Sequence, residues 1–223
     1  YTSLGLGKTI MEGENCLFFS PANPRSLPQF ATPRDYLRNA QREFFAVDLT
    51  RKIVDEKVVP VRMELDQAEK FPWEQIRLFA DAGLFGVYIP EEYGGLGGGL
   101  LDLCLVVEEL SRVCGSHGLT VAAHNSLGCA PIAKHGTEEQ KRRWLPGAAA
   151  GEFLLSFGLT EPGAGSDAGG TRTTAVRDGD QWVLNGNKQW ITNAHYAGAV
   201  IITAKTDVDA PGSSGISAFI VPT

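Results

Sequence analysis

The spacing of apolar residues changes near residue 150, and this change limits the chain to folds in which helices precede strands. Upstream, residues 100–113 have an apolar side chain at every third or fourth position, which is the helical period. Downstream, short β-branched or aromatic runs alternate with turn residues, as in EFLLSFGLT, RTTAVRD, QWVLNGNKQWIT, GAVIITAKTD and GISAFIVP. The order predicts an α+β fold, all-α first and antiparallel β-strands from about Gly151.

Local signals place most of the helices and two turns. An amphipathic helix is expected from Pro33 to Val59, because the missing N–H of Pro60 stops it. Asn185-Gly186 predicts a β-hairpin strongly, and Asp178-Gly179 predicts one more weakly. The other helices are expected over residues 72–83, 100–113, 116–134 with a break at Gly128 and Pro131, and 137–150 with Thr137 and Gln140 as a capping box.

Residues 1–33 show no clear period, and the segment SPANPRSLPQFATP holds four prolines in fourteen residues. We therefore expect an extended lead-in over residues 1–33, a helical domain over 34–150 and a strand domain over 151–223. The chain opens on Tyr1 rather than Met, which suggests a fragment of a longer protein.

Composition excludes several classes of protein. The net charge is −6 and no run of Lys or Arg occurs, so a general nucleic-acid binder is not expected. No secretory signal or apolar stretch of membrane-spanning length is visible. The cysteines form no CxxC pair, and we interpret Cys16, Cys104, Cys114 and Cys129 as small buried thiols in a reducing compartment, with no metal site.

The glycine-rich stretch GLTEPGAGSDAGG, residues 158–170, needs a separate explanation. Gly163, Gly165 and Ala168 fit the relaxed dinucleotide pattern GxGxx(G/A), but that motif requires a helix directly afterwards and strands are expected here. A phosphate-binding P-loop is excluded because no GK(S/T) follows. Two interpretations stay open: a tight structural connection, or a loop whose backbone N–H groups hold an anion or the edge of a heterocycle.

A second stretch, KQWITNA, places Trp190 close to Thr192 at the end of an expected strand. A broad aromatic face beside a hydroxyl suits a planar cofactor, which would stack on the ring and accept a hydrogen bond. Taken alone, Trp190 is better explained by core packing than by a cofactor contact.

The stretches FGLTEPGAGSDAGGTRT and GDQWVLNGNKQWITN closely resemble the two flavin-binding signatures of the acyl-CoA dehydrogenase family, in the family's order and at its separation. IPEEYGGLG, AAHNSLG and HGTEEQKRRWLP resemble further segments, so that the similarity runs from about residue 42 to 223. The resemblance implies an N-terminal helical domain and a middle β-barrel. The family's C-terminal four-helix domain is not expected within these residues.

By resemblance, residues 157–166 line FAD. Thr160 would bond the pyrimidine edge, and Gly165 and Ser166 would approach the ribityl-pyrophosphate tail and the thioester arm. Trp190 would cover one face of the ring and Thr192 would donate to flavin N5. The implied cofactor residues are Phe157, Leu159, Thr160, Gly165, Ser166, Trp190, Ile191 and Thr192, with Ser213 and Ser214 near the CoA portion.

The resemblance further implies that an acyl-CoA is dehydrogenated to a trans-2-enoyl-CoA and that electrons pass to an electron-transfer flavoprotein. Ser166 and the apolar or small residues of one helix would contact the substrate, and the absence of an Arg among them favours a simple acyl chain over glutaryl-CoA. These helix residues are Leu119, Thr120, Ala123 and Leu127. A homo-oligomer is expected, in the bacterial cytoplasm or the mitochondrial matrix.

No catalytic residue is assigned, because in most family members the general base is a glutamate of the C-terminal domain. We interpret Glu161 as a structural carboxylate that fixes the flavin loop, Glu108 and Glu109 as a solvated or helix-contact pair, and His124 as a hydrogen-bonded structural residue. Two alternatives stay open: an acyl-CoA oxidase or other flavoenzyme on the same fold, and a shortened, non-catalytic binding module.

Overall fold

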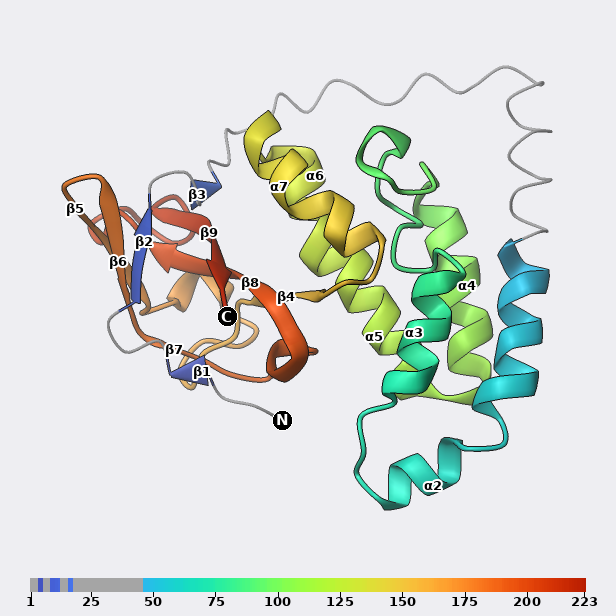
Figure 1. Cartoon of the computed structure of the whole chain (residues 1–223). Helices are drawn as coiled ribbons and strands as arrows, with labels where there is room; N and C mark the ends of the chain where they lie inside the picture. Colours follow the sequence, from blue (N-terminus) through green and yellow to red (C-terminus); the bar gives the residue numbers. More distant parts are fainter. Residues whose placement is uncertain (1–3, 6–8, 13–15, 18–45) are drawn as a thin grey trace.

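The structure is a computed structural model that describes residues 4–5, 9–12, 16–17 and 46–223. Helices gather on one side and strands on the other, with α6 and α7 next to the sheet (Figure 1). The helical part comprises residues 46–53, η2 (Val54–Val58), α2 (Arg62–Gln67), α3 (Trp73–Asp81), η3 (Glu91–Tyr93), α4 (Leu100–Val113), α5 (Gly115–Ala122), η4 (Ala123–Cys129), α6 (Ala130–His135) and α7 (Glu138–Ala149).

Local signals predicted the helix ends well. The helix before Pro60 ends at η2, while its expected first residues, 33–45, lie outside the described residues. Gly83 follows α3 with φ 75°, a backbone conformation that favours glycine, and so confirms the expected cap. At the start of α7 the capping box is confirmed, because the Gln140 N–H donates to Thr137 Oγ1 at 3.2 Å and the Thr137 N–H donates to Gln140 Oε1 at 2.9 Å.

The break expected near Gly128 is a wide helical turn instead. Residues 115–135 run through α5, the π-helix η4 and α6 without an interruption, and Pro131 lies in the first turn of α6. The buried Asn125 amide stabilises this turn, since its Nδ2 donates to the carbonyl oxygens of Leu84 and Val121 and its Oδ1 accepts from the Tyr88 N–H. The bond to Val121 thus gives a helix carbonyl a side-chain partner, while the bonds to Leu84 and Tyr88 hold the turn against the segment that follows α3.

The strands form an open sheet rather than a closed barrel. The larger sheet has the order β2-β6-β5-β8-β9-β3, with β4 also paired to β8. The strands are β1 (Leu4–Gly5), β2 (Thr9–Glu12), β3 (Cys16–Leu17), β4 (Leu154–Gly158), β5 (Thr174–Asp178), β6 (Gln181–Asn185), β7 (Asn187–Lys188), β8 (Ala197–Lys205) and β9 (Ile216–Pro222), with short helices η5 (Ala168–Gly170) and η6 (Ala194–Tyr196).

Two sequence predictions about this sheet are wrong in part. The pairing is not purely antiparallel, because β4 runs parallel to β8 and β5 meets β8 in parallel at Thr174 and Lys205. The hairpin expected at Asn185-Gly186 does not form, since β7 pairs with β1 rather than folding back on β6. The weaker signal at Asp178-Gly179 does form the β5–β6 hairpin, with Gly179 at φ 61°.

Gly186 has a different role. A Cβ atom there would collide with Thr173, the residue before β5. Glycine therefore permits a close approach of two segments rather than a tight turn, and the Asn-Gly pair misled the turn prediction for that reason.

The two faces of β8 and β9 bury separate apolar clusters. Ala199, Ile201, Ala218 and Ile220 pack with Trp144, Leu145 and other residues of the helical layer. The alternate residues Val200, Ile202, Phe219 and Val221 pack with Leu184 of β6 and Ile191. This period of two places β8 and β9 in the middle of the molecule, between the helices and the hairpin.

Part of the expected lead-in, residues 1–33, pairs with later strands: β2 and β3 join the larger sheet, and β1 forms a separate two-stranded sheet with β7. β1, β2 and β3 pair with β7, β6 and β9, respectively. The prediction of buried thiols is wrong for Cys104, which is exposed, and holds for Cys129. It holds only in part for Cys114, which is half-buried, and the side chain of Cys16 lies outside the described residues. Across the described part of the chain, no helix has the length and apolar character needed to cross a membrane.

Candidate functional site

The site lies beside one edge of β8, at the point where the strand paired with that edge changes from β4 to β5. β4 pairs with β8 up to Gly158 opposite Ile202, and β5 takes over at Thr174 opposite Lys205. The intervening residues 159–173 leave the sheet and return to it, and they contain the glycine-rich loop. Glu161 and Ala164 close its first turn with reciprocal backbone hydrogen bonds of 2.9 and 3.1 Å.

A buried ion pair lies in this gap in the sheet edge. The Lys188 side chain is 0% exposed, and its Nζ donates to Glu161 Oε1 at 2.7 Å. The same Nζ lies 3.0 Å from the Leu159 carbonyl oxygen and 3.1 and 3.2 Å from the hydroxyls of Thr171 and Thr203. A buried ammonium is stable only with such a set of acceptors, so Lys188 is held by both ends of the loop and by β8.

The Glu161 carboxylate is equally well satisfied. It accepts from the Thr171 hydroxyl at 2.9 Å and from the backbone N–H groups of Arg172 and Thr173 at 2.6 and 3.0 Å. Burial alone would raise the pKa of Glu161, but Lys188 and these donors outweigh it and hold the pKa at about 2. The expectation that Glu161 fixes the loop is confirmed.

A hydrogen bond joins the glycine loop to the second signature. Gln189 directly follows Lys188 in the sequence, and its N–H donates to the Thr160 carbonyl oxygen at 2.8 Å. The next residue, Trp190, has φ 61°, which is uncommon for a residue with a Cβ atom, and it is 57% exposed. An exposed indole on a strained backbone is a frequent property of a ligand-contacting position.

These two segments and η4 surround a hollow of about 240 Å³. Its lining combines one indole, two hydroxyls and one amide with an apolar remainder, which is a lining typical of small-molecule and cofactor sites. The lining residues are Ala123, Leu127, Phe157, Leu159, Thr160, Gln189, Trp190 and Thr192.

The helical wall of the hollow is held against β4 by buried contacts. His124 Nδ1 accepts from the Leu155 N–H at 3.0 Å, and His124 Nε2 donates to the Ala148 carbonyl oxygen at 3.1 Å. Complete burial lowers the pKa of His124 to about 4, so the ring is neutral at pH 7. The structural role predicted for His124 is confirmed. A Cβ atom on Gly128 would collide with Leu155, so glycine allows η4 to approach the strand.

The hollow contains seven of the residues singled out from the sequence. Ile191 packs into the sheet core instead, and the Thr120 hydroxyl bonds within its own helix to Ser116. Leu119, Gly165, Ser166, Ser213 and Ser214 do not line the hollow. Gln189 was missed, since an amide side chain next to a tryptophan gives no sequence signal; Lys188 was missed because a lone lysine normally indicates a solvated side chain.

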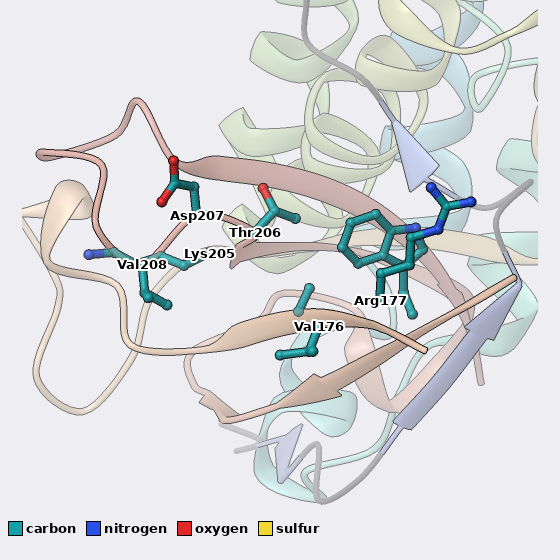
Figure 2. Close-up of a pocket in the computed structure, with 8 residues that line it drawn as sticks. Val176, Arg177, Lys205, Thr206, Asp207 and Val208 are labelled. Carbon is teal, nitrogen blue, oxygen red and sulfur yellow. The ribbon is translucent and has the colours of Figure 1, made fainter. Parts of the chain in front are cut away.

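A larger groove, of about 490 Å³, lies elsewhere on the sheet (Figure 2). Val176 and Arg177 of β5 form one side, and Lys205, Asp207 and Val208 belong to the other, at and beyond the end of β8. Val176 and Val208 are 60% and 61% exposed, and no residue singled out from the sequence lines this groove. It lacks converging buried polar groups, so we take the smaller hollow as the candidate site.

The described lining of the hollow contains no side chain that could act as a general acid or base. None of its eight described lining side chains is a carboxylate, a lysine or a histidine. Glu109, predicted to be in a solvated or helix-contact pair, bonds Arg51 and Arg112 in the helical layer, at 2.6 and 3.2 Å. Among the described residues, no group of three or more His, Cys, Asp or Glu is arranged to hold a metal ion.

Comparison with known proteins agrees with this architecture. Residues 40–152 match the family profile described as "Acyl-CoA dehydrogenase, N-terminal domain", and residues 156–223 match "Acyl-CoA dehydrogenase, middle domain". The probable acyl-CoA dehydrogenase YngJ of Bacillus subtilis is 48% identical over 176 residues, which cover 79% of this chain and 46% of that protein.

Solved structures show the same fold. Butyryl-CoA dehydrogenase from Megasphaera elsdenii superimposes with a TM-score of 0.77 at 34% identity, over 88% of this chain and 50% of that one. An acyl-CoA dehydrogenase from Bacillus anthracis, complexed with FAD, gives a TM-score of 0.72 at 37% identity, over 86% of this chain and 32% of that one. The chain belongs to the acyl-CoA dehydrogenase family, and it spans about half the length of the curated relatives that it matches.

Proposed function

We propose that the protein is a FAD-dependent acyl-CoA dehydrogenase that converts an acyl-CoA thioester to the trans-2-enoyl-CoA, and that this chain forms the helical and sheet walls of its flavin site. One observation carries the proposal: residues 157–160 and 189–192, distant in sequence, together with η4 enclose one hollow that presents an indole and two hydroxyls. The family membership and the FAD complex of the Bacillus anthracis relative support the same ligand.

The residues of the hollow fit a flavin. The exposed Trp190 indole offers a stacking surface, and Thr160 and Thr192 contribute two hydroxyl-bearing side chains to the lining of the hollow. Gly163 and Gly165 have open space around them, so that backbone N–H groups of the loop are accessible to a phosphate tail without side-chain obstruction. FAD, when bound, supplies the acceptor for the hydride that leaves the β-carbon of the substrate.

The residues of the chain then contribute binding, orientation and water exclusion. Trp190 would cover one face of the ring, and Thr160 and Thr192 would hydrogen-bond its polar edges. Leu127 and Ala123 of η4 form an apolar wall beside these groups, which suits the first carbons of an acyl chain. Leu119, Thr120, Ile191, Gly165 and Ser166 stay proposed contacts that do not line the hollow itself.

Proton removal from the α-carbon requires a base that the described hollow does not contain. We therefore assign no catalytic base to Glu161, whose carboxylate is already occupied by Lys188 and by backbone donors. The base would come from outside the eight lining residues.

For the substrate we propose a short, unbranched acyl-CoA. The lining has no cation to pair with a second carboxylate, and the structurally similar Megasphaera elsdenii protein is a butyryl-CoA dehydrogenase. We further propose an electron-transfer flavoprotein as the acceptor, a homo-oligomeric assembly, and a location in the bacterial cytoplasm or mitochondrial matrix.

Anaerobic titration of the FAD-loaded intact protein with butyryl-CoA tests the function, because this chain by itself is expected to be inactive without the base. The expected result is bleaching of the visible absorbance of the flavin as it is reduced, with little bleaching by glutaryl-CoA. Stoichiometric hydrogen peroxide in aerobic turnover would identify an oxidase instead. Bound FAD without bleaching by any acyl-CoA would support a non-catalytic module, and failure to bind FAD would overturn the proposal.

A further inference from the structure

We propose that Lys188 and Glu161 are positioning residues for the flavin site, in that their buried ion pair holds the glycine loop and the Trp190 loop in the ligand-competent arrangement before any ligand binds. The inference rests on the proposed function and deepens it. Neither side chain lines the hollow, so both act through their neighbours.

The position of the pair in the fold is the first argument. Lys188 is the residue before Gln189, and Gln189 and Trp190 line the hollow directly. On the other segment, Lys188 Nζ bonds the carbonyl oxygen of Leu159 and the carboxylate of Glu161, which lie on either side of Thr160. One ammonium group therefore links the segment that contains Thr160 to the segment that contains Gln189 and Trp190.

The second argument is that the contacts converge from three segments. Thr171 and Thr173 tie the returning end of the loop to Glu161, and the Thr203 hydroxyl of β8 lies 3.2 Å from Lys188 Nζ. The Lys205 N–H also donates to the Thr173 carbonyl oxygen at 2.8 Å. The pair thus lies in the gap along the edge of β8 between its pairing with β4 and its pairing with β5, where backbone pairing is interrupted.

The energetic argument favours a role in positioning over one in stability. A buried ion pair often contributes little net stability, because the cost of removing two charges from water offsets their attraction. Replacement of both partners by uncharged residues of similar volume is commonly neutral, whereas removal of one partner leaves a buried charge unpaired. What a neutral pair would not replace is the set of directed bonds to Leu159, Thr171 and Thr203.

The test compares Lys188→Met, Glu161→Gln and the double variant in the full chain. The matched control is Glu109→Gln, which makes the same substitution in a second buried carboxylate; Glu109 pairs with arginine rather than lysine and lies outside the hollow. Three quantities are measured: the melting temperature without ligand, the dissociation constant for FAD, and hydrogen exchange of residues 157–173 and 187–193 without ligand.

We expect both single variants to melt at lower temperature and the double variant to recover most of that loss. FAD binding by the double variant should still be weaker by about tenfold or more, because directed bonds to a charged group are lost. Its amides in the two segments should exchange faster than in the wild type. Glu109→Gln should lower the melting temperature and leave FAD affinity and exchange in these segments unchanged.

A double variant with wild-type FAD affinity and wild-type exchange in both segments would overturn the inference and leave the proposed function intact. If the wild-type protein does not bind FAD, the proposed function fails, and the exchange measurement still decides whether the pair orders the two loops. In the FAD-loaded double variant, a shifted flavin absorbance maximum would be a further sign of altered positioning, which a purely global loss of stability would not produce.

Discussion

His124 Nδ1 accepts a hydrogen bond from the Leu155 N–H at 3.0 Å and so joins η4 of the helical layer to the first residues of β4. This nitrogen is available only in the neutral ring, because the other nitrogen already donates to Ala148. Protonation of the buried ring would break the bond and leave a buried charge. The contact between the two layers should therefore depend on pH.

The first prediction concerns acid destabilisation. The pKa of His124 is lowered from 6.5 to about 4 in the folded protein, so the unfolded chain binds the proton more readily. The stabilisation is complete above pH 6.5 and is lost as the pH falls toward 4, by about 3 kcal/mol for this group. Urea unfolding at pH 7, 6 and 5 measures the slope.

His117 adds to this slope in the same direction, because burial also lowers its pKa. Glu161 acts in a lower window, since its pKa of about 2 removes stability only between pH 4.5 and 2. His124→Gln should therefore flatten the dependence between pH 6.5 and 5. An unchanged slope in that variant would contradict the assignment.

The second prediction concerns Gly128. An added methyl group would meet the backbone of Leu155, which cannot rotate away, so Gly128→Ala should destabilise the protein by about 1–3 kcal/mol or more. Gly165→Ala is the matched control, because nothing lies within 4 Å of the added Cβ atom there. Chemical denaturation measures both variants, and equal stability of the two would refute the packing explanation.

The third prediction concerns the Thr192 hydroxyl. Thr192→Val keeps the shape of the side chain and removes its donor, so the melting temperature should change little while flavin reduction by butyryl-CoA slows by about tenfold. Rapid-mixing absorbance measures the rate. Thr206→Val, whose hydroxyl bonds Gly215 and Ser217 away from the hollow, should leave the rate unchanged. Wild-type reduction kinetics in the FAD-loaded Thr192 variant would refute the hydrogen bond from this hydroxyl to flavin N5.

The fourth prediction concerns chain length. Leu127 lines the hollow and is 46% exposed, so Leu127→Ala should enlarge the space proposed for the acyl chain at small cost in stability. The ratio of kcat/KM for hexanoyl-CoA to that for butyryl-CoA should rise by about tenfold, as expected when a pocket gains space for a methylene group or more. Leu101→Ala serves as control, since Leu101 of α4 is 58% exposed and does not line the hollow. An equal rise of this kcat/KM ratio in both variants would contradict a specific contact between Leu127 and the acyl chain.

Local order was predictable from the sequence because local interactions produce it. The period of α4, the capping box of Thr137 and Gln140 and the glycine after α3 all act within a few residues, and each appears where it was expected. The two signature stretches also identified most of the hollow, because their residue types and order carry the family resemblance.

Tertiary structure decided the features that depend on distant partners. The parallel pairing of β4 with β8 depends on where residues 159–173 leave and rejoin one edge, and no period-two pattern encodes this. Asn185-Gly186 looked like a hairpin, yet Gly186 is required by its approach to Thr173. Lys188 looked like a solvated lysine, yet it is buried because Glu161, Leu159, Thr171 and Thr203 meet it from other segments. The sequence by itself determined which elements form and which loops matter. Only the packed structure decided how those loops are held together, because the free energy of a buried charge depends on groups that are brought close by the fold.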